Sequence, residues 1–159
     1  MQVLSNELKA VAVLADISEE GSSITRDQCM AVEHFHYRCA RKRDTKGHTY
    51  ASCEPVELSF DVRINAADQA KPFYQHLTSG DDDTVLSFLF NATFSATKRL
   101  ATYEQAMAVN GFIVDVQEIY HSASPIDDSE EQIILRARML VRSIIYVEDD
   151  NQRTLQFVE

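Results

Sequence analysis

Apolar and polar residues alternate along much of this chain, and a period of two is typical of half-buried β-strands. Residues 56–64 read Val-Glu-Leu-Ser-Phe-Asp-Val-Arg-Ile, with an apolar side chain at every even position. Successive side chains of a strand point to opposite faces, so one face of this strand packs and the other is solvated. The same alternation predicts a second strand, in which Leu86, Phe88, Phe90, Ala92 and Phe94 share one face and Ser87, Asn91 and Thr93 the other.

Two further long runs follow the same pattern. Phe112, Val114 and Val116 mark a third strand that ends near Tyr120. A fourth spans residues 132–147, where Ile133, Leu135, Ala137, Met139 and Val141 share a face. Shorter strands are predicted at residues 8–15, 30–39, 103–109 and 154–158, which makes about eight strands in all.

One segment, residues 65–77, has the features of a helix. It follows a strand and opens on Asn65, a residue type common at helix N-caps. Pro72 fits best in a first helical turn, so we expect the helix to start near residues 68–71. Phe73 and Leu77 give it one apolar edge, and Ser79-Gly80 should end it.

The chain of 159 residues is long enough for one hydrophobic core, and no linker or internal repeat divides it. Polar loops are expected at residues 41–52, 122–131 and 148–152. We therefore predict a single domain, residues 1–159, that is mainly β. A β-barrel with one short helix beside it is favoured over a sandwich.

Charge and cysteine content exclude several classes of protein. Fifteen basic and 25 acidic residues give a formal net charge of −10, which disfavours generic nucleic-acid binding. Three cysteines, Cys29, Cys39 and Cys53, are too few and odd in number for a disulfide scaffold. No apolar run is long enough to cross a membrane, and residues 10–15 are too short for the core of a signal peptide. We expect synthesis in the cytosol and no membrane insertion.

No constellation of residues predicts an active site. Cys29, His34, His36 and Cys39 could bind zinc, but their spacing matches no common zinc motif and Cys39 lies on the other face of the strand from the histidines. The acidic residues of 81–83 and 148–150 lack the ligand pattern of a calcium loop, and we interpret them as solvated turns. We expect no metal, no cofactor and no enzymatic activity.

The second face of the fourth run is unusual, because it carries Ile134, Arg136, Arg138, Leu140, Arg142 and Ile144. A strand fully solvated on one side would not normally place three apolar residues there. Two interpretations stay open: a subunit interface or tube-lining surface, or a face that the chain's own helix covers in part. Three arginines in a chain of net charge −10 also favour acidic partner surfaces, including those of a neighbouring copy.

The order of these motifs is similar to that of a known family. A strand ends in Tyr37-Arg38-Cys39-Ala40-Arg41, and the loop Arg43-Asp44-Thr45-Lys46-Gly47 follows it. Then come the alternating strand, the helix, the phenylalanine-rich strand, Asn110-Gly111-Phe112 and Gln132-Ile133-Ile134-Leu135. From about residue 8 to residue 158 the chain resembles the tube protein of type VI secretion systems (Hcp, also called TssD), most of all its divergent forms from Bacteroidetes. Residues 17–29 make the first connection longer than the family pattern.

The resemblance implies a β-barrel that forms hexameric rings, and rings that stack into the inner tube of a contractile injection machine. The implied partners are other copies of the chain, the sheath, the spike, the baseplate and secreted effectors. The tube would assemble in the cytoplasm and leave through the contractile apparatus without a signal peptide. A loop that reaches the next ring would contain Arg43, Asp44, Thr45, Lys46, Gly47 and His48, and acidic turns such as residues 81–83 would receive it.

Two alternatives remain. One is a tail-tube or adaptor subunit of another contractile injection particle. The other is a barrel that binds a small ligand in a cavity lined by Phe88, Phe90 and Phe94. Mass in solution separates these hypotheses, because a ligand-binding barrel can be monomeric and a tube subunit should assemble.

Overall fold

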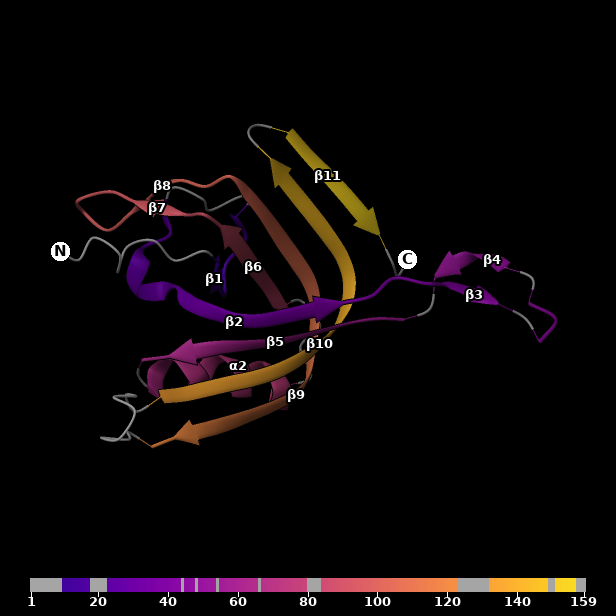
Figure 1. Ribbon diagram of the computed structural model, residues 1–159, viewed down its shortest axis with the longest axis horizontal. Coiled ribbons are helices and arrows are strands. Elements are labelled where there is room, and N and C mark those ends of the chain that lie inside the picture. The colour runs from indigo at the N-terminus through magenta and orange to yellow at the C-terminus, as the bar shows by residue number, and fades with distance from the viewer. Residues whose placement is uncertain are drawn as a thin grey trace.

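The computed structural model describes residues 10–17, 23–43, 45–47, 49–53, 55–65, 67–79, 84–122, 132–148 and 151–156. Its strands are β1 (Ala10–Val13), β2 (Met30–Tyr37), β3 (Arg41–Arg43), β4 (Thr49–Cys53), β5 (Val56–Ile64), β6 (Thr84–Phe90), β7 (Thr93–Phe94), β8 (Leu100–Thr102), β9 (Gln105–His121), β10 (Gln132–Glu148) and β11 (Asn151–Gln156). A 3₁₀ helix covers Arg26–Gln28, and the helix α2 covers Ala67–Ser79 (Figure 1). The described part contains no helix that is both long and apolar enough to span a membrane.

Six strands close into a barrel in the order β10-β5-β2-β1-β6-β9, because β9 also pairs with β10. All of these pairings are antiparallel, and β11 adds to the second half of β10. Two short hairpins, β3–β4 and β7–β8, lie outside the barrel. The expected class, a mainly β barrel with a helix beside it, is confirmed.

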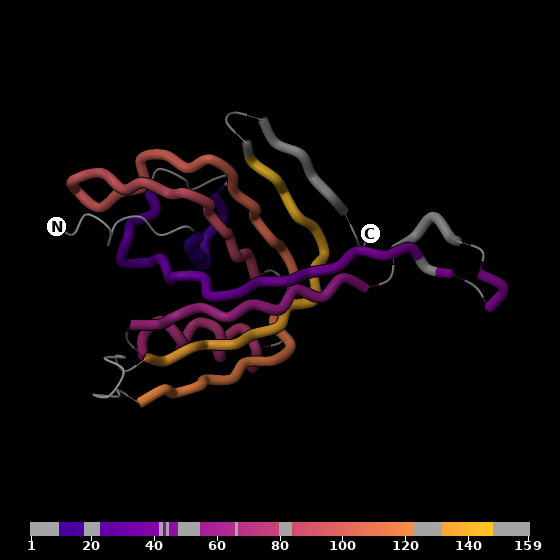
Figure 2. Tube along the Cα trace, in the orientation of Figure 1, coloured from indigo at the N-terminus to yellow at the C-terminus, as the bar shows by residue number. Residues whose placement is uncertain are grey.

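The barrel has two halves because β9 and β10 are long and strongly bent (Figures 1 and 2). In one half, β6 pairs with the beginning of β9, up to Gly111. In the other half, β2, β5, the first part of β10 and the end of β9 lie side by side. Gly111 stands where β9 passes between the halves: a Cβ there would lie 2.0 Å from the carbonyl oxygen of Leu140. Only glycine allows the two strands to approach so closely.

The barrel interior is a packed aromatic and aliphatic core. Phe60 and Phe88 are fully buried, and Phe88 stacks on Phe35 with ring centroids 5.2 Å apart. The helix α2 packs against β9 and inserts Phe73 beside Phe60, at 6.0 Å between centroids. The helix begins at Ala67, earlier than expected, so Pro72 lies inside it and not in its first turn.

A second apolar cluster covers the outside of the first half. Val11, Leu89 and Ala106 turn outward from β1, β6 and β9, and Ile17, Ile24 and Cys29 of the first connection pack over them. Ser87 lies beneath this cover, fully buried. Its hydroxyl donates to the Ala15 carbonyl at 2.6 Å and accepts from the Ile17 N–H at 3.0 Å.

Several expected strand faces are wrong in their details, and irregularities in the strands are the cause. The second strand ends at Phe90, because Asn91 adopts a positive φ of 54°. A register shift between Arg138 and Met139 makes Val114 an extra residue of β9, so Ile113 is buried and Val114 is exposed. Another shift between Val141 and Ser143 turns Ile144 into the core.

The remaining expectations concern loops. The polar segment of residues 41–52 contains the hairpin β3–β4 and is not an irregular loop. Residues 81–83, 123–131 and 149–150 lie outside the described residues, and so do the first nine and last three of the chain.

Candidate interaction surface

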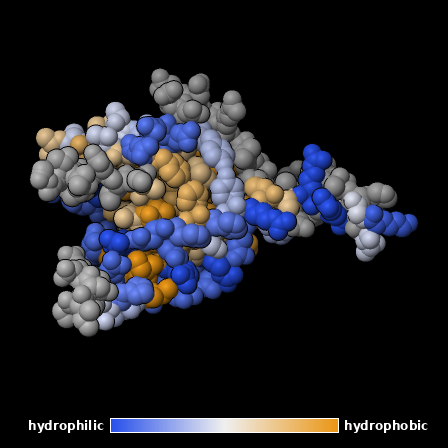
Figure 3. Space-filling model, in the orientation of Figure 1, coloured by the Kyte–Doolittle hydropathy of each residue, from blue (hydrophilic) through white to orange (hydrophobic). Residues whose placement is uncertain are grey.

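The outer side of the second half forms a grid of side chains that no described segment covers. We call it the open face. Strand register aligns its residues in rows that run across β2, β5, β10 and β9. The two central rows are His34–Asp61–Arg136–Gln117 and His36–Ser59–Arg138–Asp115. Figure 3 shows a largely hydrophilic surface over these strands, interrupted by apolar patches.

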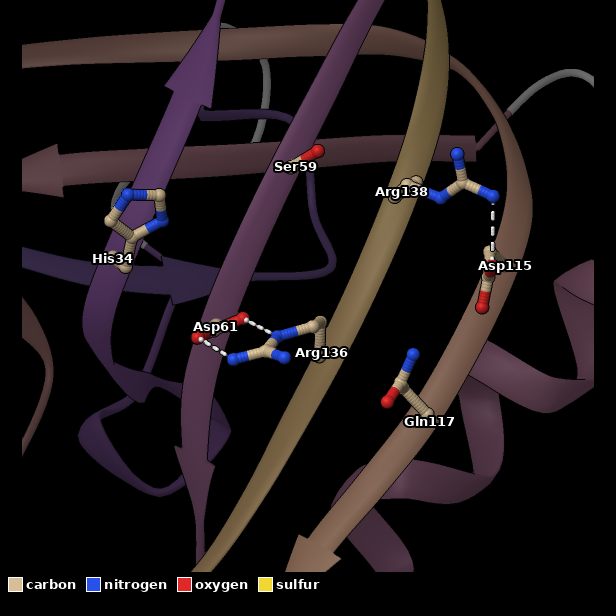
Figure 4. Close-up of a pocket in the computed structure, with 7 residues that line it drawn as sticks. All are labelled: His34, Ser59, Asp61, Asp115, Gln117, Arg136 and Arg138. Carbon is tan, nitrogen blue, oxygen red and sulfur yellow. Dashed lines mark hydrogen bonds and ion pairs between the residues drawn. The ribbon is translucent and has the colours of Figure 1, made fainter.

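Arg136 forms a bidentate ion pair with Asp61 on the neighbouring strand. Its Nε and Nη2 donate to the two carboxylate oxygens at 2.9 and 3.0 Å (Figure 4). The side-chain hydrogen bond from Arg136 lowers the pKa of Asp61 below its usual range, although partial burial opposes this. Two parallel charge-assisted bonds fix the orientation of both groups.

Arg138 bridges two carboxylates, one on each neighbouring strand. Its Nη1 donates to Glu57 on β5 and its Nη2 to Asp115 on β9, both at 2.8 Å. Hydrogen bonds to Asp115 and then to Glu57 raise the pKa of Arg138 above its usual range. One cation therefore faces two anions, so the cluster of Glu57, Arg138 and Asp115 carries one surplus negative charge.

A third ion pair lies at the end of the grid, where Arg63 contacts Glu33 at 2.5 Å. Glu33 is the extra residue where the register of β2 against β5 shifts. Over the three clusters, three arginines face four carboxylates. The open face is thus nearly neutral, in a chain whose net charge is −10.

Between the rows lies a shallow hollow of about 380 Å³, lined by His34, Ser59, Asp61, Asp115, Gln117, Arg136 and Arg138. Figure 4 shows these side chains coming from four adjacent strands. Apolar residues bound the grid at both ends. The pair Ile134–Ile119 lies on one side and Leu140–Phe112 on the other.

Three of the four residues predicted on the interface or lumen strand, Arg136, Arg138 and Leu140, share the open face. Arg142 does not continue this alternation along β10, because it is the extra residue at the register shift of that strand. The helix α2 lies on the core side of this sheet, with Phe73 in the core. The interpretation in which the chain's own helix covers this face is therefore wrong.

Both edges of this four-stranded half are open. Beyond Ala31, none of the described strands pairs with β2 on the side away from β5. At the opposite edge, residues 112–121 of β9 pair only with β10 within the described chain. Such edges present backbone N–H and C=O groups that another strand can bind.

The hairpin β3–β4 projects from the end of β2 as a narrow arm (Figures 1 and 2). Of the predicted loop residues, Arg43, Thr45, Lys46 and Gly47 are exposed on it, whereas Asp44 and His48 lie outside the described residues. Residues 38–48 carry five of the 15 basic residues and one of the 25 acidic ones, a formal charge of +4. The rest of the chain carries −14.

The other candidate residues of the sequence do not converge. Cys29 is buried under the first connection, where burial raises the pKa of its thiol to about 12, whereas His34 lies on the open face. No group of three metal-ligating side chains occurs among the described residues. Phe88 and Phe90 belong to the main core and Phe94 to the second cluster, so the three do not line one cavity.

The partners of the arginines, namely Asp61, Glu57 and Asp115, were not singled out from the sequence. The signal was present in part, since Glu57, Ser59, Asp61 and Arg63 alternate along one strand face. The register that sets Arg136 opposite Asp61 depends on pairing across 75 positions, which the sequence does not display.

Comparison with solved structures relates this fold to Hcp proteins. A crystal structure described as an Hcp protein has a TM-score of 0.61 at 13% identity, covering 94% of this chain and 98% of that one. A mutant form of Hcp1 from the E. coli EAEC 042 pathovar has a TM-score of 0.61 at 12% identity, covering 94% of this chain and 99% of that one. Hcp1 from Flavobacterium johnsoniae has a TM-score of 0.53 at 10% identity, covering 91% of this chain and 97% of that one. No protein-family model and no curated protein matches the chain. The expected Hcp fold is confirmed.

Proposed function

We propose that this chain is a tube subunit of a type VI secretion system, which forms hexameric rings that stack into a tube. The observation that carries the proposal is the four-stranded half with two open edges and a charged, uncovered face. The shared Hcp fold supports it. The role is structural: the subunit works by assembly and performs no chemistry.

The strand directions favour ring closure. In the order β2-β5-β10-β9, each strand is antiparallel to the next. Because the number of strands is even, the β9 edge of one copy runs antiparallel to the β2 edge of the following copy. Any number of copies can join in this way, and every contact between the β9 edge of one copy and the β2 edge of the next, which we call the joint, is antiparallel. Two different complementary edges per copy give a head-to-tail contact, which closes a ring when the rotation permits.

In such a ring the open face lines the bore and α2 lies outside it. Cargo would then pass over rows of paired arginines and carboxylates. We infer that secreted effectors travel through this bore, and that sheath, spike and baseplate proteins contact the assembled tube. The subunit would assemble in the cytoplasm before export through the apparatus.

The basic arm supports stacking of one ring on the next. It leaves the sheet where β5 begins, and the connection of residues 123–131 joins β9 to β10 where β5 ends. Nine residues of β5 separate these two ends by about 30 Å. In the sequence, residues 123–131 contain four carboxylates and no basic residue. Opposite charges at opposite ends favour head-to-tail contacts between rings.

The first experiment is light scattering on a sizing column, with negative-stain images of the same fraction. Rings of six copies support the proposal, and a monomer at every accessible concentration contradicts it. To test the edges, single cysteines replace His36 on β2 and Gln117 on β9 in a background without native cysteines. A short bismaleimide should link the double variant into a ladder that ends at the ring size. Each single variant should stay unlinked, because neither edge meets itself.

The arm is tested separately by replacing Arg43, Asp44 and Lys46 with alanine. Rings should persist while stacks are lost, and the fold should be unchanged. The control replaces Lys98 and Arg99, two exposed cations by the hairpin β7–β8, and should leave stacking intact although it removes more positive charge than the arm variant does. Unchanged stacking in the arm variant would refute the assignment of the arm.

A further inference from the structure

The two open edges differ in the charge that they carry. On the β9 edge, Asp115 shares Arg138 with Glu57, so this cluster has one cation and two carboxylates. On the β2 edge, the side chains of the same two rows are the imidazoles of His34 and His36. The cluster with surplus negative charge reaches the β9 edge through Asp115, and the β2 edge with its two imidazoles complements it when these bases are protonated.

We infer that the His34–His36 pair on β2 of one copy faces Asp115 on β9 of the next, and that this contact makes joining of the copies depend on pH. The inference rests on the proposed ring. It names the groups that meet at the joint and the condition that strengthens it.

The row geometry brings these side chains within reach. Adjacent strands lie about 4.8 Å apart, and directly opposite Cβ atoms are about 5 Å apart. If the rows continue level across the joint, Asp115 stands opposite His36, which shares its row. Closing a sheet into a ring requires a stagger between copies. A stagger by one row brings His34 opposite Asp115 in place of His36. An imidazole therefore meets the carboxylate in the level register and in this stagger, and the opposite stagger brings Arg38 there in its place.

Within one copy, His34 already has a carboxylate beside it, because its charge helps to lower the pKa of Asp61, whereas His36 has none opposite it. His34 lies beside Asp61, which Arg136 binds through both carboxylate oxygens, and next to the Arg63–Glu33 pair. His36 lies opposite Ser59, in the row of Arg138. The third imidazole on this face, His121, is on β9 itself, three rows from Asp115. It shares an edge with the carboxylate and cannot bridge the joint.

The sign of the effect follows from the protonation of histidine. An unperturbed imidazole gains its proton below pH about 6.5. At pH 5.5 each joint acquires up to two cations beside a cluster that carries one surplus anion. An exposed pair of this kind changes an association constant about two- to fivefold. A ring closed by several such joints multiplies that factor, so ring stability should rise steeply as the pH falls from 8 to 5.5.

The experiment is sedimentation velocity on a dilution series at pH 5.5, 6.5 and 7.5, at constant ionic strength. For the unmodified protein the midpoint concentration of ring dissociation should increase with pH. The double variant His34→Gln, His36→Gln should dissociate at one concentration at every pH, equal to that of the unmodified protein at pH 7.5. His36→Lys, with a permanent cation, should be less dependent on pH and more stable at pH 7.5.

Two control variants separate this joint from other histidines. His121→Gln and His76→Gln, on β9 and α2, should retain the pH dependence. Rings whose stability does not change with pH, or that weaken as the pH falls, overturn the inference and leave the proposed ring intact. A monomer under all conditions overturns the proposed ring, and the inference with it.

Discussion

The outer face of the barrel is apolar and covered in one half, and charged and open in the other. Over β1, β6 and the beginning of β9, residues 15–17 and 23–29 of the first connection form a cover that we call the lid, and the residues beneath it are apolar apart from Ser87. Over β2, β5 and the end of β9 no described segment lies, and the same strand face carries ion pairs. The chain therefore buries its second apolar face itself and leaves the charged face uncovered by any described segment.

Replacing one leucine with alanine in each half should give the largest difference in the free energy of unfolding. Leu89→Ala removes a fully buried side chain beneath the lid and should lower the free energy of unfolding by about 2–5 kcal/mol. Leu140→Ala, on the half-buried margin of the open face, should cost less than about 1 kcal/mol. Urea denaturation of both variants measures the two values. Equal losses would contradict the distinction between the halves.

Gly111 tests the crossing between the halves. In Gly111→Ala the new Cβ would meet the Leu140 carbonyl oxygen at 2.0 Å, and neither strand can yield without breaking its pairing. We expect a loss of about 3 kcal/mol, from overpacking against backbone. Thermal denaturation followed by circular dichroism measures it. If the variant matched the unmodified protein in stability, the close approach of β9 and β10 would be wrong.

Ser87 tests the attachment of the lid. Ser87→Ala leaves the Ala15 carbonyl and the Ile17 N–H without their side-chain partner, which should cost about 1–2 kcal/mol. Ser59→Ala, on the open face, is the matched control and should be nearly neutral. Amide hydrogen exchange at Ile17 should become faster in the first variant only. Unaltered protection of Ile17 would mean that Ser87 does not hold the lid.

The sequence predicted the strands well because each half-buried strand keeps its period of two over its regular part. It failed where a strand changes register. Val114 and Ile144 read as members of alternating faces, but a single extra residue in each strand reverses the faces beyond it. Such a bulge depends on the pairing with the neighbouring strand, so the local sequence pattern does not predict it.

The two faces of β6 show a related limit. Ser87 was expected on a solvated face, since a hydroxyl alternates there with buried aromatic residues. It is instead fully buried, because Ala15 and Ile17 of the first connection lie over it and hydrogen-bond to its hydroxyl. On the open face, Arg136 and Arg138 were recognisable as an unusual pair, but their carboxylate partners come from distant strands. Long-range pairing, and not local propensity, decides both cases.

The smallest expected effect concerns the Arg136–Asp61 pair. Arg136 lowers the pKa of Asp61 in the folded protein, so the ionised carboxylate stabilises the fold at pH values above its unfolded pKa of about 3.9. That contribution is lost as the pH falls through the lower, folded value. Asp61→Asn should therefore be slightly less stable than the unmodified protein at pH 7, and the gap should narrow below pH 4. Arg136→Gln should give the same pattern, because it removes the cause of the lowered pKa of Asp61.

The pair is partly solvated, so high salt should shrink the difference in stability at pH 7. A gap that stays constant from pH 7 to pH 3 would assign the loss to packing and not to charge. The side chains would then stabilise the fold through their contacts, and the charge of the pair would contribute nothing measurable.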